Sequence, residues 1–185
     1  PFLEEKLGSF LFQMLDYALK SFDERVVQEC IQENNLVMEY DTLIASAKVP
    51  FRGGIYNLPQ MGKFMQDVDR NTRKEASEAY YAYLDENIKD KAEQIYDSLV
   101  KVRTEMAHKL GYSSYTQLAY IRMGRYDYNE QDVAAYREQM REFVTPIAAK
   151  IAKAAFKRTG ITSPRLYDLS LSFKEGNPIP NGTTQ

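Results

Sequence analysis

The chain has 185 residues, a formal net charge of −2 and a 44% share of apolar residues, with only nine glycines and seven prolines. This composition is typical of a soluble, mostly helical protein, and the length suffices for one sizeable core or two small helical units. The nearly balanced charge gives no indication of nucleic acid or a membrane surface as a partner. No apolar run reaches the roughly 18 residues that a membrane-spanning helix needs.

Cys30 is the only cysteine. The chain can therefore form no internal disulfide and no cysteine-based zinc site. A single reduced cysteine, together with an N-terminus that lacks the pattern of a signal peptide, leads us to expect a cytoplasmic protein.

The first quarter of the chain predicts two amphipathic helices. From Phe2 to Leu19 the apolar residues recur at three- and four-residue steps, which places them on one face of a helix. A second helix is expected to begin after a cap at Ser21 and to run toward Ala45, with Asn34-Asn35 as a candidate interruption.

Residues 43–58 show the pattern of a short β-hairpin. Apolar residues alternate with more polar ones up to Val49, and Gly53 and Gly54 can supply the positive φ of a tight turn. Pro50 cannot donate a hydrogen bond to a sheet, so this strand is expected at an edge.

The rest of the chain is predicted to be helical up to about residue 160. Residues 59–66 are expected to form a short helix or a turn. The expected longer helices run from Asp67 or Asp69 to about 86, over 88–110, from Ser113 or Ser114 to about 124, and over 129–160. Pro146 lies inside the last of these helices and removes one backbone hydrogen bond, which predicts a kink near Glu142. The narrow apolar seam over 88–110 indicates packing within the domain, with a coiled-coil partner as the alternative.

Residues that carry chemistry are sparse. The usual helical zinc site of a hydrolase needs two histidines on one face and a nearby carboxylate, whereas this chain contains His108 alone. We interpret His108 as a helix residue near a C-terminus. Asp67 and Asp69 lack the further ligands of a calcium loop and are interpreted as helix caps.

Two surface patterns each leave an alternative open. The dense tyrosines, Tyr80, Tyr81, Tyr83, Tyr126 and Tyr128, favour helix packing, with a peptide-gripping surface as the alternative. The basic residues between Lys150 and Arg158 could contact phosphate, but acidic residues are interspersed along the chain and no aromatic stacking positions accompany them, so we expect no nucleic acid partner.

The order and spacing of several segments resembles the oligoendopeptidase F branch of the M3 zinc peptidases. These segments are Glu39–Ser46, Val49–Gly53, Asp69–Arg73, Arg103–Ala107, Leu110–Tyr112, Tyr115–Met123, Asp132–Val133, Val144–Pro146 and Leu166–Asp168. The resemblance covers most of the chain from about Leu36 onward, and none of the segments is a catalytic signature.

The resemblance implies an all-helical peptidase whose deep channel admits short peptides and excludes folded proteins. In that family the zinc-binding His-Glu-x-x-His helix lies downstream of the segment that matches Tyr167-Asp168. Zinc is therefore expected in the parent enzyme and not in this segment, and no zinc ligand or general base is carried over to any position here. Residues 1–160 are expected to form the helical N-terminal lobe, including the hairpin, and residues 161–185 a connector toward a missing catalytic domain.

The leading hypothesis is an N-terminal fragment of a zinc-dependent oligoendopeptidase that forms one wall of the substrate channel and is inactive by itself. Its partners would be the catalytic domain of the same protein and short peptides, and it should expose a large apolar face where the catalytic part docks. Because an edge strand can pair with an extended peptide, the candidate channel residues are Phe51, Gly53, Gly54 and Tyr56. The alternatives are a free-standing helical binding or scaffold module and a hydrolase built from Asp, Glu and Tyr alone.

Overall fold

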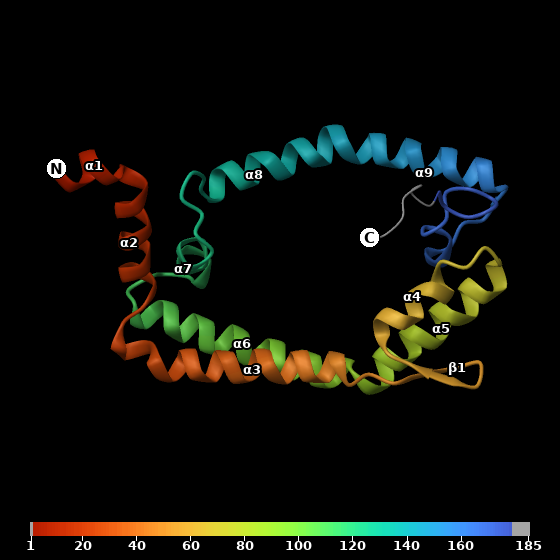
Figure 1. Ribbon diagram of the computed structural model, residues 1–185, viewed down its shortest axis with the longest axis horizontal. Coiled ribbons are helices and arrows are strands. Elements are labelled where there is room, and N and C mark those ends of the chain that lie inside the picture. The colour runs from red at the N-terminus through yellow and green to blue at the C-terminus, as the bar shows by residue number, and fades with distance from the viewer. Residues whose placement is uncertain (1, 179–185) are drawn as a thin grey trace. The chain divides into compact units, whose positions relative to one another are not determined.

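The computed structural model describes residues 2–178, which divide into two compact units, each assembled from two stretches of chain. The first unit comprises residues 2–42 and 91–136, and the second comprises residues 43–90 and 137–178. Helices dominate the described residues, and one hairpin accompanies them (Figure 1). The expected all-α fold with one short β-hairpin is therefore confirmed.

The helices lying wholly or mostly in the first unit are α1 (Phe2–Leu7), α2 (Ser9–Ser21), the 3-10 helix η1 (Glu24–Val26), α3 (Val27–Ala45), α6 (Lys89–Lys109), α7 (Tyr115–Arg122) and α8 (Glu130–Gln139). The second unit holds β1 (Val49–Phe51), β2 (Gly54–Tyr56), α4 (Leu58–Met65), α5 (Arg70–Asn87), the π-helical turn η2 (Met140–Val144), α9 (Thr145–Thr159) and the 3-10 helix η3 (Leu166–Asp168).

Three expectations for the first two helices are wrong. The single helix over Phe2–Leu19 is broken at Gly8, whose φ of 84° ends α1 before α2 begins. The cap before α3 is Asp23, which accepts the Arg25 backbone N–H at 2.9 Å, and not Ser21. Helix α3 runs without interruption through the two asparagines.

The core of the first unit lies where η1, α6 and α7 meet. Val26, Met106, Ala107 and Leu118 are fully buried there, and the half-buried Cys30 packs against them. Burial is the main reason that the pKa of the Cys30 thiol is raised, so this cysteine stays protonated.

Helices α3 and α6 lie side by side and antiparallel, as Figure 1 shows. Three ion pairs join them along their length. They link Glu29 to Lys109 at 2.5 Å, Glu33 to Arg103 at 2.6 Å and Glu39 to Lys91 at 2.6 Å. The predicted seam of α6 supplies the buried Ile95 and Val102. Charged residues therefore set the register of this pair along with apolar ones.

The second unit packs α4, α5 and the hairpin around buried side chains from each of them. Val49, Phe51, Met61 and Ala76 are buried. Helix α4 begins with a capping box, in which Asn57 and Gln60 each accept the other's backbone N–H at 2.9 Å.

A buried carboxylate, Asp168, ties η3 to the start of α5. Its Oδ1 accepts from Arg70 Nε at 3.0 Å and from Arg73 Nη2 at 3.1 Å, and its Oδ2 accepts from Arg70 Nη2 at 2.8 Å and from the Arg165 backbone N–H at 2.9 Å. We call Asp168, Arg70 and Arg73 the Asp168 clamp. Asp168 is 0% exposed and Arg73 1%.

The remaining N–H donors of Arg73 form hydrogen bonds with backbone carbonyls. Its guanidinium donates to the carbonyls of Tyr167, Asp67 and Val68 at 3.1, 2.8 and 2.9 Å. Ion pairs and hydrogen bonds to backbone oxygens thus attach the segment after Thr162 to the start of α5. Leu169, next to the clamp, is exposed, and the buried apolar residue of this segment is Leu171.

Near Glu142, where a kink was expected, the structure has the π-helical turn Met140–Val144 directly before α9. Pro146 lies in the first turn of α9 and cannot donate to the carbonyl four residues earlier, that of Glu142. In the same turn the Thr145 hydroxyl donates to the Met140 carbonyl at 3.1 Å. Gly160, at a φ of 75°, ends α9 as expected.

Replacing Asp168 with Asn should lower the free energy of unfolding at pH 7 by about 3 kcal/mol, because Arg73 would be left buried without its anion. Hydrogen bonds from Arg70, from the Arg165 backbone and from Arg73 outweigh burial and lower the pKa of Asp168 to about 2. Because the pKa of Asp168 is lower in the folded state, its ionised carboxylate stabilises the fold fully at pH values above the pKa of Asp in the unfolded chain, which is about 3.9. That contribution is lost as the pH falls toward 2.

The difference between the wild type and Asp168→Asn should therefore shrink by about 2 kcal/mol between pH 4 and pH 2, as measured by urea unfolding followed by circular dichroism. Asp16→Asn is the matched control, because Asp16 forms an exposed pair with Lys20, and it should cost under about 0.5 kcal/mol. Equal effects of the two substitutions would contradict the account of the clamp.

Candidate functional site

The residues considered for metal binding do not form a metal site. His108 is exposed in the last turn of α6, the position expected for it. Asp69 caps α5 by accepting the Thr72 backbone N–H at 2.7 Å, and Asp67 accepts the Asp69 backbone N–H at 2.8 Å. Among residues 2–178, no group of three or more His, Cys, Asp or Glu side chains could hold a metal ion. The donors present therefore do not fit a catalytic zinc.

The candidate channel residues lie on the β1–β2 hairpin, whose strands pair antiparallel in the register Val49 with Tyr56, Pro50 with Ile55 and Phe51 with Gly54. The residues with positive φ in the turn are Arg52 at 46° and Gly53 at 80°. The prediction that the two glycines supply the turn is thus wrong, because Gly54 is already in β2 and an arginine takes the other turn position. Positive φ at both central residues matches the tight hairpin turns that follow the twist of the strands.

Phe51 and Tyr56 face α4. Their rings lie 5.0 and 4.9 Å from the ring of Phe64, and the ammonium of Lys63 lies 4.9 Å from the centroid of the Tyr56 ring. A Cβ at Gly54 would come within 2.6 Å of the Tyr56 hydroxyl, so the missing side chain leaves room for that ring. These three candidates therefore fix the hairpin on α4, and Gly53 lies at the tip with open space around it.

The opposite face of the hairpin is open. Pro50 and Ile55 are exposed, and Ile55 is 70% exposed. Because Phe51 and Gly54 flank a two-residue turn, they form a hydrogen-bonded pair, and the next pair, Pro50 and Ile55, directs its backbone groups outward. Proline is tolerated at this position because its missing N–H would not have joined the ladder. Within residues 2–178 no backbone hydrogen bond engages the outward N–H and C=O of Ile55, so they can pair with another strand.

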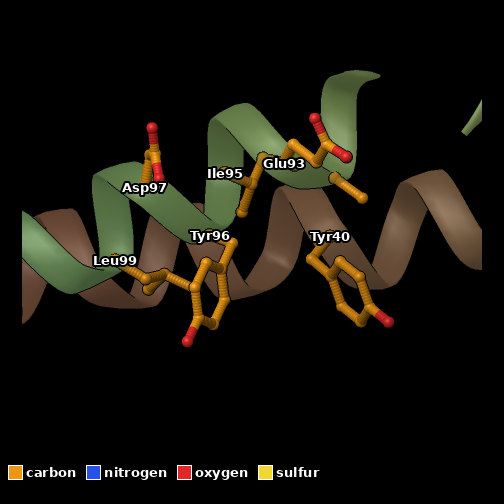
Figure 2. Close-up of a pocket in the computed structure, with 7 residues that line it drawn as sticks. Tyr40, Glu93, Ile95, Tyr96, Asp97 and Leu99 are labelled. Carbon is orange, nitrogen blue, oxygen red and sulfur yellow. The ribbon is translucent and has the colours of Figure 1, made fainter. Parts of the chain in front are cut away.

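A pocket of about 600 Å³ opens in the first unit, between α3 and α6. Its lining residues are Tyr40 of α3 and Ala92, Glu93, Ile95, Tyr96, Asp97 and Leu99 of α6. Figure 2 shows the rings of Tyr40 and Tyr96 on one side of the helix pair, while the carboxylates of Glu93 and Asp97 point the other way. The pocket can hold an apolar side chain but assembles no acid–base pair. The sequence prediction missed it, because Tyr40 and Tyr96 lie far apart in the sequence.

Glu33 is the most strongly paired acid of the first unit. It is 4% exposed and accepts from Arg103 Nε at 2.6 Å and from Arg122 Nη2 at 2.6 Å. Burial raises the pKa of the Glu33 carboxyl, but hydrogen bonds from the two arginines outweigh it, so the net pKa is lowered. Glu33 is therefore a fixed anion that joins α3, α6 and α7, and it is unsuited to exchange protons near neutral pH.

Most of the dense tyrosines contribute to packing, as expected. The Tyr83 hydroxyl accepts the Lys48 backbone N–H at 3.0 Å, and the Tyr126 ring lies 5.2 Å from Phe10 and 4.8 Å from Tyr17. Tyr81 and Tyr128 differ, since both are exposed.

No helix among the described residues combines the length and apolar character needed to cross a lipid bilayer. No protein-family model matches the chain, and no curated protein sequence matches it.

Three solved structures are similar to it. One is PZ peptidase A with an inhibitor, at a TM-score of 0.93 and 40% identity over 98% of this chain. Another is a chain assigned as oligoendopeptidase F from Bacillus anthracis str. Ames, at a TM-score of 0.90 and 41% identity over 98% of this chain. The third, also assigned as oligoendopeptidase F, has a TM-score of 0.93 and 37% identity, again over 98% of this chain.

The chain spans about a third of each of these structures, 32%, 33% and 32% of their length respectively. The sequence resemblance is therefore confirmed: this chain has the fold of one third of an oligoendopeptidase F-type peptidase.

Proposed function

We propose that this chain, which has the fold of an oligoendopeptidase F segment, is one part of a zinc-dependent endopeptidase that hydrolyses short peptides. The chain forms one wall of the substrate channel and has no peptidase activity by itself. The observation that carries the proposal is the close match in fold and sequence over 98% of this chain to about a third of each similar peptidase.

Exposed apolar faces support a role as part of a larger protein. The turn η2 and helix α9 expose Phe143, Val144, Ile147 and Ile151, and helix α2 exposes Phe10, Leu11, Met14 and Leu15. The surface of the chain is 13588 Å². Two separate compact units of half its mass would together expose only about 11,000 Å². Apolar faces of this extent are expected to be covered by another protein surface, here the catalytic part of the same peptidase.

The catalytic zinc of this activity needs donors from outside residues 2–178. His108 is the only imidazole of the chain, and a zinc site without thiolates usually takes at least two. Zinc supplies a Lewis acid that activates water for attack on a peptide carbonyl. This chain contributes surfaces that position peptides, and short peptides are its partners in the complete enzyme.

The hairpin is the proposed peptide contact, and its candidate residues divide into two roles. Phe51, Gly54 and Tyr56 hold the hairpin on α4, and Gly53 shapes its tip. The outer edge of β2, at Ile55, offers the backbone N–H and C=O that an extended peptide would pair with.

The proposal is tested first by activity. A longer polypeptide that contains this segment and a downstream His-Glu-x-x-His should cleave a quenched fluorescent peptide of about ten residues and lose this activity with a zinc chelator. The purified 185-residue chain should cleave none. Chelator-sensitive cleavage by the 185-residue chain alone would contradict the proposal, and chelator-resistant cleavage by it would favour a hydrolase built from its own Asp, Glu and Tyr residues. A stop codon directly after Gln185 would favour a free-standing scaffold.

The second test concerns the β2 edge. Ile55→Pro removes the outward N–H without removing a ladder hydrogen bond, so in the longer polypeptide it should raise KM for short peptides by about tenfold or more. Ile55→Thr keeps the N–H and serves as the control, with KM changed by less than about twofold. An unchanged KM for Ile55→Pro, with zinc content and stability intact, would contradict the proposal that the hairpin contacts the peptide.

A further inference from the structure

Arg125 is held in a defined position between α7 and α8. Its backbone N–H donates to the Tyr120 carbonyl at 3.1 Å, and Gly124 before it has a φ of 63°. The guanidinium carbon lies 4.3 Å from the centroid of the Tyr120 ring and 5.7 Å from that of the Tyr128 ring. Stacking on aromatic rings orients a guanidinium and leaves the N–H donors at its rim available.

Those donors have no acceptor in the described part of the chain. Arg70, Arg73, Arg103 and Arg122 each form ion pairs with a carboxylate, whereas the Arg125 side chain makes ring contacts only among residues 2–178. A planar guanidinium with free donors is the group that best recognises a carboxylate, by two parallel hydrogen bonds.

Arg125 also lines a pocket of about 440 Å³, entirely within the first unit. The other lining residues are Tyr128, Asp132, Val133 and Tyr136. Tyr128 and Tyr136 are exposed, at 47% and 60%. The pocket therefore combines one cationic group with a largely aromatic and apolar wall, which suits a ligand that carries an apolar side chain next to its charge.

Asp132 is the one acidic residue of this lining. Its Oδ2 accepts the Asn129 backbone N–H at 2.9 Å, and this hydrogen bond holds the Asp132 carboxylate at the start of α8. Its charge opposes a bound anion, so a ligand carboxylate must lie on the Arg125 side of the pocket.

We propose that the Arg125 pocket binds the C-terminal carboxylate of a short peptide. The guanidinium forms a bidentate pair with the carboxylate, and the rings of Tyr128 and Tyr136 pack against the side chain of the last residue. A terminal α-carboxylate fits better than an isolated anion, because it carries a side chain on the adjacent carbon that can occupy the apolar part of the pocket. The choice of a peptide as ligand rests on the proposed function.

The test is an NMR titration of the 185-residue chain with N-acetyl-Ala-Phe carrying either a free C-terminal carboxylate or a C-terminal amide. The free acid should shift the resonances of Arg125, Tyr128 and Tyr136, and the amide should bind about tenfold more weakly or worse. Equal binding of acid and amide would overturn the proposal. Acetate binding as tightly as the peptide would overturn the role of the two rings.

Substitutions locate the binding. Arg125→Gln should weaken the affinity for the free-acid peptide by about tenfold or more. Arg125→Lys keeps the positive charge but loses the planar pair of N–H donors, so its affinity should lie between those of Arg125→Gln and the wild type. Asp132→Asn keeps an acceptor for the α8 cap and should tighten binding several-fold, because it removes the opposing charge. Lys101→Gln, at an exposed position on α6, removes the same net charge as Arg125→Gln and should leave binding unchanged.

Unchanged binding in both Arg125 variants, with backbone spectra that show a native fold, would overturn the proposal. Since the titration measures binding to the 185-residue chain and the proposed function is tested by cleavage in a longer polypeptide, either can fail without the other.

Discussion

A buried carboxylate held by two arginines joins distant parts of the chain in each unit. Glu33 binds Arg103 and Arg122 in the first, and Asp168 binds Arg70 and Arg73 in the second. An unpaired charge in either place would be very costly, so the partners must adopt one arrangement. The helices are thereby positioned partly by ions, and the apolar stripes of α2 and α9 do not all have to face the core of this chain.

Because buried ion pairs position some of the helices, a folded segment can expose this much apolar surface. The helix predicted over residues 129–160 is present as α8, η2 and α9, but Phe143, Ile147 and Ile151 are exposed on it. In a protein three times as long, such as the similar peptidases, these faces would have a surface to contact. The proposed roles of the hairpin edge and of the Arg125 pocket both use polar groups that have no hydrogen-bond partner within residues 2–178: the outer edge of β2 and the guanidinium of Arg125.

Periodicity predicted the helices well, because one-face repeats and capping residues are local. It failed where one residue overrides the pattern, as at Gly8, or where the conformation is unusual for the residue, as at Arg52 with its positive φ. The Asp168 clamp and the Tyr40–Tyr96 pocket could not be predicted, because their members lie more than 50 positions apart and no local pattern pairs them. The sequence could not show either that the Arg125 side chain has no acceptor among residues 2–178, because only the fold determines which arginines lie next to an acid.

The central claim, that the exposed apolar faces are contact surfaces of a larger peptidase, is tested most directly by covalent footprinting of aliphatic and aromatic side chains. Labelling would be compared between the 185-residue chain and a longer polypeptide that contains it. We expect strong labelling of Phe143, Ile147 and Ile151 in the chain alone and labelling several-fold lower in the longer polypeptide, while the buried Leu118 stays unlabelled in both. Equal labelling of these three residues in the two proteins would contradict the account.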